Sequence, residues 1–431
     1  MRWVLIGPVW PYRGGIAQHT ALLARTLAGA GHEVTTLTFR SLYPAWLFPG
    51  RTVIDPSQQP VRVQAERIIA PLWPFGWPAV ARRVRAARPD AVLLVWWVPF
   101  FAPFVVGFSA LLGRRGRRPP IVLICHNVLP HDAHGARGRV AGWLTALALR
   151  RGDRWLVHAT PLVAVLEGVV GERARMPGAV ARAALPLHHL ADVGGGDGVT
   201  PDDAVHDDTV TGDAAGPDGV GPRRIGPAPT LLFFGLVRPY KGLDVLIDAL
   251  AIARETVPGV RLVVAGEFWQ RVDAFRAQAD RLGLGDAVTL RDGYVQNEEV
   301  APLFASADAV VLPYRAATSS GVLTLAIEHG VPMIVTDVGG LPEVVVDGEA
   351  GLVVPPGDAR ALAAAVVRLC RERGLATRLR AGSVAARGRI GWAAYVAALV
   401  GLVGGAGVDD GAAGAGDAAA VARAPAHGTA R

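Results

Sequence analysis

Short apolar runs alternate with helix-like segments along most of this chain, and the alternation is interrupted only once. Before the interruption, strand-like segments such as 33–39 and the apolar run 121–125 are separated by segments with helical spacing such as 16–30. After it, the alternation resumes at residue 230 and continues through the helix-like segment 359–373. Strands that alternate with helices form parallel sheets with helices on both faces. The sequence therefore predicts an α/β protein with a parallel sheet in each part.

The interruption covers residues 191–229. This segment is rich in Gly, Asp and Pro and contains no aromatic residue, so it cannot bury enough apolar surface to offset the entropy lost on ordering. We interpret it as a disordered linker or insertion between a first domain, 1–190, and a second domain, 230–385. A final helical stretch, 386–403, follows, and the Gly- and Ala-rich residues 404–431 are predicted to be disordered.

Positive charge is concentrated in the first domain. Residues 1–190 contain 23 basic and 8 acidic residues, a net charge of +15, whereas the whole chain has a net charge of +7. Such an excess fits an anionic membrane surface or a phosphorylated substrate, and a solvated arginine surface is the plain alternative. No nucleic-acid-binding motif is recognisable, so nucleic acid is not an expected partner.

Three features bear on the compartment. The two cysteines lie far apart in apolar segments, which indicates a reducing environment rather than a disulfide framework. The N-terminal apolar stretch is too short for a signal peptide. Residues 91–112 carry no charge and precede GRRGRR, but Pro99 and Pro103 interrupt them. We therefore expect a buried strand and helix rather than a membrane span, with a membrane-dipping surface as an alternative, in a cytoplasmic protein.

The chain contains a single lysine among its 44 basic residues. Lys241 lies in FFGLVRPYKGLDVLIDAL, where an apolar run ends, a cationic loop follows and a helical pattern begins. A loop between a strand and a helix start is a common phosphate site. Lysine is a compact point charge that arginine does not reproduce. We therefore predict that Arg238 and Lys241 bind phosphate, with a chance surface cation as the alternative for Lys241.

Two Rossmann-like domains joined by a linker place a cleft between them, and ligands in such folds bind at the carboxyl ends of the strands. The hydroxyl and amide groups at a helix start also suit a diphosphate, although Ser320 could simply cap that helix. The residues expected at these strand ends are Gly14, Gly15, Trp97, His126, Asn127, Arg238, Lys241, Glu267, Tyr294, Val295, Thr318, Ser319, Ser320, Gly321 and Val322.

A metal site is not expected. His131 and His134 follow His126 but have no acidic or cysteine partner at ligand spacing. No Asp-x-Asp pair occurs in the chain, which argues against a sugar-nucleotide site built on a divalent metal. His126 itself is either a site residue or an ordinary core histidine at a strand end.

An ordered set of motifs resembles a known family. The chain reads GPVWPYRGGIAQHTALLARTLAGAGHEV at its start, then ICHN, FFGLVRPYKGLDVLIDAL, GEFWQ, DGYVQNEEVAPLFASADAVVLPY and GVPMIVTDVGGLPEVVVDGEAGLVVPPGD. This order resembles the retaining glycosyltransferases of the group 1, or family 4, type, which have the GT-B fold. The resemblance covers nearly everything except residues 191–229 and the tail.

The resemblance implies roles for the candidate residues. The second domain should bind a nucleotide-diphosphate sugar and the first domain the acceptor. Arg238 and Lys241 should hold the diphosphate, with Gly15 approaching it from across the cleft. The backbone at 294–295 should contact the base, and His126 should lie near the transferred sugar. The final helix, with Trp392, should cross back to the first domain. No cofactor is implied.

The chain also departs from the family pattern. Two glutamates usually stand where this sequence has Ala317 and Leu325, and Glu328 lies on a different helical face from the second of them. The usual arginine before the lysine is replaced by Leu236, for which Arg238 could substitute. We interpret this as a divergent branch with altered donor contacts.

The predicted activity is transfer of a glycosyl unit, with retention, from a nucleotide-diphosphate sugar to a hydroxyl acceptor in glycolipid, polysaccharide or cell-envelope glycan synthesis. The alternatives are a non-catalytic sugar-nucleotide-binding protein and a GT-B epimerase. A basic, aromatic first domain suits a lipid-linked acceptor and peripheral contact with the inner face of the plasma membrane, unless these aromatic residues are core: Trp46, Trp73, Phe75, Trp77, Trp96 and Trp97.

Overall fold

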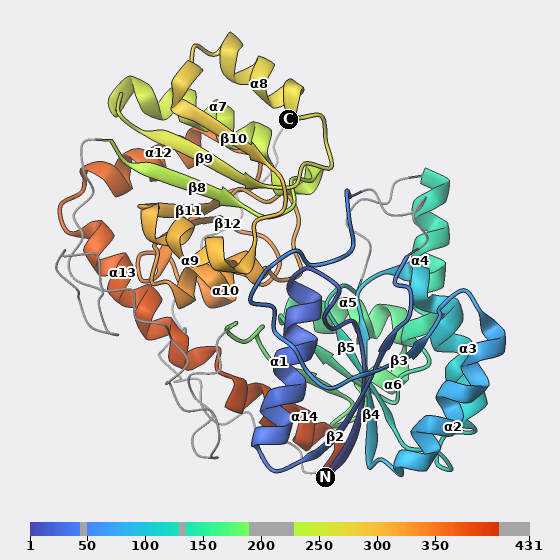
Figure 1. Cartoon of the computed structure of the whole chain (residues 1–431). Coiled ribbons are helices and arrows are strands. Elements are labelled where there is room, and N and C mark those ends of the chain that lie inside the picture. The colour runs from blue at the N-terminus through green and yellow to red at the C-terminus, as the bar shows by residue number, and fades with distance from the viewer. Residues whose placement is uncertain (44–49, 129–134, 189–227, 405–431) are drawn as a thin grey trace, which may run out of the picture.

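The computed structural model of the chain describes residues 1–43, 50–128, 135–188 and 228–404 (Figure 1). The predicted linker 191–229 and tail 404–431 lie almost entirely outside the described residues, as do Trp46, His131 and His134. Two α/β units are stacked, and the last helices run down one side from the second unit to the first (Figure 1).

The first unit is a seven-stranded parallel sheet with the order β3-β2-β1-β4-β5-β6-β7. Its strands are β1 Arg2–Ile6, β2 Glu33–Phe39, β3 Glu66–Ile69, β4 Ala91–Trp96, β5 Ile121–Cys125, β6 Arg154–Val157 and β7 Val180–Arg182. Its helices are α1 Gly15–Gly29, α2 Trp77–Ala87, α3 Ala102–Leu112, α4 Gly135–Leu149, α5 Pro161–Val170 and α6 Glu172–Arg175.

The second unit is a six-stranded parallel sheet with the order β10-β9-β8-β11-β12-β13. Its strands are β8 Thr230–Phe234, β9 Arg261–Gly266, β10 Val288–Asp292, β11 Ala309–Leu312, β12 Met333–Thr336 and β13 Gly351–Val354. Its helices are α7 Leu243–Thr256, α8 Val272–Arg281, α9 Asn297–Ser306, α10 Gly321–Glu328, α11 Leu341–Val344, α12 Ala359–Arg371 and α13 Leu375–Ala386.

The uncharged run 91–112 forms a buried strand and a helix, as predicted. All six residues of β4 are buried, because β1 and β5 pair with it on either side and a core cluster covers each of its two faces. A short 3₁₀ turn at Pro99–Phe101 then leads into α3, which packs into the first core. Within the described part of the chain, no helix is both long and apolar enough to cross a membrane.

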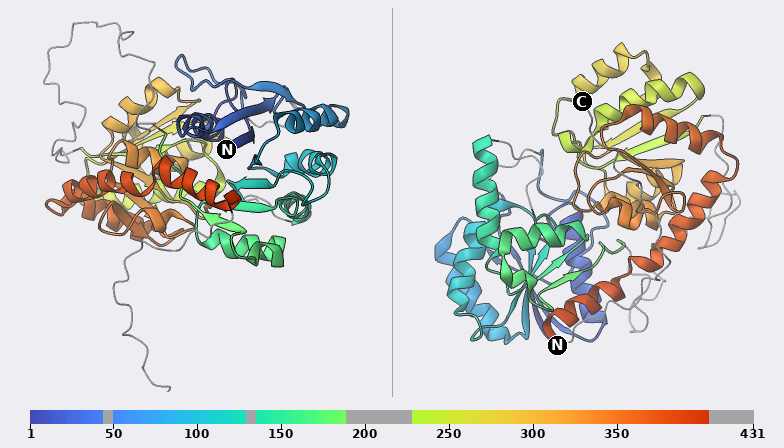
Figure 2. Two further views of the ribbon diagram at one scale, coloured as in Figure 1. Left: turned by 90° about the horizontal axis from the view of Figure 1, so that it is seen from below. Right: turned by 180° about the vertical axis from the view of Figure 1, so that it is seen from behind.

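The last described helix, α14 (Trp392–Gly404), packs on the first unit. Figure 2 shows this helix, in red, lying along the first unit in both views. Its Trp392, Tyr395 and Leu399 join a core with Trp3 and Leu23, which covers one face of the first sheet. The indole Nε1 of Trp392 donates a hydrogen bond to the backbone oxygen of Leu187 at 2.8 Å. A turn at Arg387–Arg389 separates α14 from α13.

Candidate active site between the two domains

The loop after β8 holds the single lysine inside the protein. Lys241 ends a 3₁₀ turn and is only 8% exposed. Gly242 follows with φ 67°, and a Cβ there would lie 2.1 Å from the backbone oxygen of Pro313, so only glycine allows this close turn. The Nζ lies 5.4 Å from the ring centroid of Tyr314. Burial, and then the charge of Arg238, lowers the pKa of Lys241 to about 8. No carboxylate among the described residues pairs with it.

Arg238 is positioned by aromatic rings in the same pair of loops. Its guanidinium lies 4.8 Å from the ring centroid of Trp269 and 5.7 Å from that of Tyr240. The loop after β9 is joined to this one because Val237 N donates to the backbone oxygen of Glu267 and Trp269 N donates to that of Val237. Two cations therefore project from one rigid strand-end unit, and their mutual repulsion favours an anion beside them.

The start of α10 faces the same region. Ser320 is the N-cap residue, but its side chain makes no capping hydrogen bond, and its Oγ lies 3.3 Å from Tyr314 Oη. The alternative of capping by Ser320 is therefore not what the structure shows. Thr318 Oγ1 instead donates to groups of the first domain, the backbone oxygen of His126 at 3.0 Å or Asn127 Oδ1 at 3.2 Å. The helix start is thus fixed against the end of β5.

The first domain contributes an uncapped helix start of its own. Gly14 is the N-cap of α1 with φ 97°, a conformation that favours glycine, and it makes no side-chain cap. A Cβ added at Gly14 or Gly15 would meet no described atom within 4 Å. The Tyr294 side chain of the second domain hydrogen-bonds to the backbone of Gly14, so this helix start lies against the other domain.

A buried ion pair that we did not predict from the sequence joins the two domains beside these groups. The Arg13 guanidinium contacts the Glu267 carboxylate, and the two side chains are 7% and 3% exposed. Arg13 also lies over the ring of Tyr294, 5.0 Å from its centroid. The sequence offered one indication that Arg13 belongs to the site, namely its position directly before Gly14.

His126 lies in a cluster of buried histidines. Its ring is 4.7 Å from the centroid of His19 and 4.8 Å from that of His158. Neither nitrogen of His19, nor Nε2 of His126 or His158, has a hydrogen-bond partner among the described residues. Burial and neighbouring histidines lower the pKa values of His19 and His126 well below the usual range, and burial lowers the pKa of His158 to about 4.

Tyr395 of α14 completes the histidine cluster from the other side, with its ring centroid 5.2 Å from that of His19. The sequence had indicated only His126, because the other members come from distant elements. No group of side chains in the described ranges is arranged to hold a metal ion.

Further predicted residues, and those at the family's glutamate positions, make the following contacts. Asn127 Nδ2 donates to the backbone oxygen of Trp97, and Trp97 Nε1 donates to Tyr43 Oη. Leu325 is packed among apolar side chains of the second domain. Glu328 accepts a hydrogen bond from His188 N at 3.1 Å. Its carboxylate is thus engaged with residue 188 and does not take the place of the family glutamate at position 325. Val295 is half-buried.

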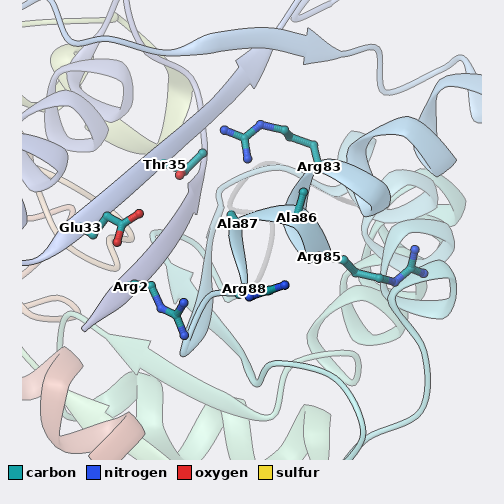
Figure 3. A pocket seen from close by; sticks show the side chains of 8 residues that line it. All are labelled: Arg2, Glu33, Thr35, Arg83, Arg85, Ala86, Ala87 and Arg88. Atoms are coloured by element: carbon teal, nitrogen blue, oxygen red, sulfur yellow. The ribbon is translucent and has the colours of Figure 1, made fainter.

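A hollow of about 770 Å³ lies away from this site, at the amino-terminal ends of β1 and β2 (Figure 3). Four arginines line it, and Arg83 is engaged by Glu66. None of the predicted site residues lines this hollow.

Two family models match the chain along both domains. The model described as glycosyl transferase 4-like domain matches residues 14–182, and the model described as glycosyl transferases group 1 matches residues 228–372. The chain belongs to the group 1 glycosyltransferases. The predicted family and the two-domain GT-B fold are therefore confirmed.

Curated relatives of this group 1 glycosyltransferase match over part of their length. The D-inositol 3-phosphate glycosyltransferase of Xylanimonas cellulosilytica is 35% identical over 176 residues, which are 40% of this chain and 41% of the relative. The phosphatidyl-myo-inositol mannosyltransferase of Mycobacterium leprae is 33% identical over 173 residues, which are 40% of this chain and 45% of the relative. The chain thus matches less than half the length of these relatives.

Solved structures with the same fold match over nearly the whole chain. Sucrose-phosphate synthase from Thermosynechococcus elongatus has a TM-score of 0.61 at 20% identity and covers 92% of this chain and 96% of its own. Anabaena HepE in complex with UDP and glucose has a TM-score of 0.61 at 16% identity and covers 94% of this chain and 100% of its own. At these identities the likeness shows the fold.

Proposed function

We propose that this chain transfers a sugar, with retention, from a nucleotide-diphosphate sugar to a hydroxyl acceptor in the synthesis of a glycolipid, a polysaccharide or a cell-envelope glycan. The observation that carries the proposal is Lys241, a buried cation beside Arg238 and without an acidic partner in the described structure. Burying a charge is costly unless an opposite charge compensates it, and a diphosphate would supply that charge.

The donor site extends from these cations to the helix starts on both sides. Gly14 and Gly15 would face the diphosphate from the first domain, and residues 318–322 from the second. The backbone at 294–295 would contact the base. HepE, which shares the fold, is described with UDP and with UDP-glucose, so we include UDP-sugars among the donors to test.

In the proposed reaction, the bond between the anomeric carbon and the diphosphate oxygen breaks while the acceptor oxygen bonds to the same face of that carbon. The acceptor proton passes to the leaving phosphate, so no side-chain nucleophile is required. Arg238 and Lys241 stabilise the charge that develops on the diphosphate. Loss of one such preorganised group costs on the order of 10²–10³ in rate. Because side-chain cations take this part, we propose that transfer proceeds without a metal ion.

The test compares Lys241→Ala with Arg276→Ala. Arg276 is an exposed cation in the same domain, paired with Asp273 and away from the 238–241 loop, so its loss controls for a general change of charge. Release of nucleoside diphosphate from UDP-, GDP- and ADP-sugars is measured in chelator, with and without a bacterial lipid extract. We expect the rate of nucleoside diphosphate release to fall by a factor of about 10²–10³ in Lys241→Ala and to stay near the wild-type rate in the control. Wild-type rates in that variant would refute the proposal.

A non-catalytic sugar-nucleotide-binding protein is the second candidate, because Ala317 and Leu325 occupy the positions of the family glutamates. Donor binding without release of nucleoside diphosphate on any acceptor would favour it. A sugar product formed without acceptor would instead indicate an epimerase.

For the acceptor, we propose a lipid-linked hydroxyl reached at the inner face of the plasma membrane. The aromatic residues of the first domain fall into a buried and an exposed group. Trp96 is buried in the core, whereas Trp73 and Phe75 are 61% and 79% exposed. The ring centroids of Trp73 and Phe75 lie 5.3 Å apart. Trp143, on α4, is 63% exposed. Exposed aromatic groups on a basic domain suit an anionic lipid surface.

Flotation with phosphatidylglycerol vesicles tests this part. Trp73→Ser with Phe75→Ser, and Trp143→Ser, should each weaken vesicle binding. Ile252→Ser, an exposed apolar residue of the second domain, should leave it unchanged. Equal binding by all variants would remove the membrane from the proposal.

A further inference from the structure

A line of polar contacts fastens the first domain to the loops after β9 and β10. Residues 50–59, which we call the strap, supply most of them. Arg51 N donates to Glu267 Oε1 at 2.6 Å, and the Arg51 guanidinium contacts Asp292 at 2.6 Å. Asn297 N donates to Ser57 Oγ at 3.0 Å. The strap therefore contacts Asp292 and Asn297, on either side of the backbone at 294–295 that the proposed function assigns to the base.

Glu267 is the centre of this closure. One carboxylate oxygen contacts Arg13 and the other accepts from Arg51 N. The Arg13 and Glu267 side chains are almost completely buried. Removing one member of a buried ion pair leaves the other charge uncompensated, which is far more costly than removing both. In the empty protein, the Arg13 charge is thus balanced by Glu267.

The ion pair adjoins the proposed diphosphate site from both sides. The backbone oxygen of Glu267 accepts from Val237 N at 2.9 Å, one residue before Arg238. Arg13 precedes Gly14, the N-cap residue of α1, where no side chain caps the helix and a Cβ would meet no described atom within 4 Å. A long, flexible arginine at this position can reach an anion in front of α1 with little movement of its backbone.

We propose that Arg13 exchanges partners, pairing with Glu267 in the empty protein and with the donor diphosphate when the site is loaded. This inference rests on the proposed function. It makes the Arg13–Glu267 pair an interdomain clasp, in which Glu267 opposes donor binding by competing for the arginine. A direct donor contact by the Glu267 carboxylate would have the opposite consequence, because its loss would then weaken binding.

The test is calorimetric titration with inorganic pyrophosphate, and separately with UDP, of the wild type, Glu267→Gln, Arg13→Met and the double variant. Glu267→Gln should bind pyrophosphate about tenfold more tightly, and Arg13→Met more weakly, than the wild type. In the Arg13→Met background, the gain from Glu267→Gln should shrink to under about threefold, since only general charge repulsion is then relieved. Unchanged or weaker binding by Glu267→Gln would overturn the clasp.

Thermal unfolding checks that each variant is folded, and two further variants serve as controls. If Glu267→Gln does not fold, Glu267→Asp keeps the buried charge but withdraws it from Arg13, and it should tighten binding in the same direction. Lys241→Ala separates the two proposals. If Lys241→Ala abolishes pyrophosphate binding but Glu267 variants do not tighten it, only the clasp fails. If Lys241→Ala binds as the wild type does, the proposed diphosphate site fails.

Discussion

Thr318 Oγ1 donates a hydrogen bond to the backbone oxygen of His126, 3.0 Å away on the other domain. Thr318 belongs to the loop that starts α10, and His126 follows β5. Asn127 Oδ1, at 3.2 Å, is the alternative acceptor for the same hydroxyl. This contact sets the position of the proposed diphosphate loop relative to the proposed sugar side of the cleft.

Thr318→Val should therefore disturb both stability and turnover. The change keeps the shape but leaves a buried carbonyl without its donor, at a cost of about 1–3 kcal/mol. Thr26→Val is the matched control, because Thr26 is buried but bonds only within α1. Urea unfolding and donor turnover are measured for both. If Thr318→Val turns over donor like Thr26→Val, the contact does not align the site.

Donor affinity should fall as the pH rises above about 8. The pKa of Lys241 is lowered to about 8, chiefly by burial, so the empty site loses this charge above that pH. Binding a diphosphate favours the charged lysine and must then recover a proton, which costs up to about tenfold in affinity per pH unit. Titrations from pH 7 to 9.5 measure the effect. Lys241→Arg should flatten the profile, and an equally steep profile there would assign the titration elsewhere.

Stability should decline as the pH falls from about 6.5 to 4. Burial lowers the pKa of His158 to about 4, whereas in the unfolded chain it titrates near 6.5. In that window the unfolded state binds more protons, so acid favours unfolding, by about 3 kcal/mol for His158 alone. Urea midpoints at pH 7.5 and 5 should differ less in His158→Gln than in the wild type.

The control for this acid sensitivity is His32→Gln, at a less buried histidine whose ring contacts Trp3 rather than the cluster. It should retain more of the wild-type difference between the two pH values than His158→Gln does. Loss of the difference in both variants would mean that the cluster is not its source.

Trp392→Ala should destabilise the first domain strongly. The side chain is 3% exposed and its indole bonds to Leu187, so truncation leaves a cavity and an unpaired carbonyl, costing about 3–5 kcal/mol. Trp143→Ala, at an exposed tryptophan, should cost less than about 0.5 kcal/mol. Thermal unfolding compares them, and equal melting temperatures would contradict the packing of α14.

Much of the architecture is predictable because hydrophobic periodicity is local. The strand expected at 33–39 matches β2, and the helix expected at 16–30 matches α1 to within one residue. The edge strands β3, β7 and β13 were not predicted; β3 and β7 are only partly buried and lack the continuous apolar run that marks a central strand. The site is harder to predict from the sequence. Arg13 contacts Glu267, which lies 254 residues away along the chain, and no local pattern indicates that pairing.

The first domain is not a continuous stretch of the chain, because α14 supplies one side of its core. During synthesis, α1 covers part of the face that holds Trp3, Leu5 and Leu93, but the rest of it must wait for residues 392–402. A ribosome-bound or prematurely terminated product would expose this apolar surface. Chaperones and proteases can therefore distinguish an incomplete chain from a finished one by the first domain alone.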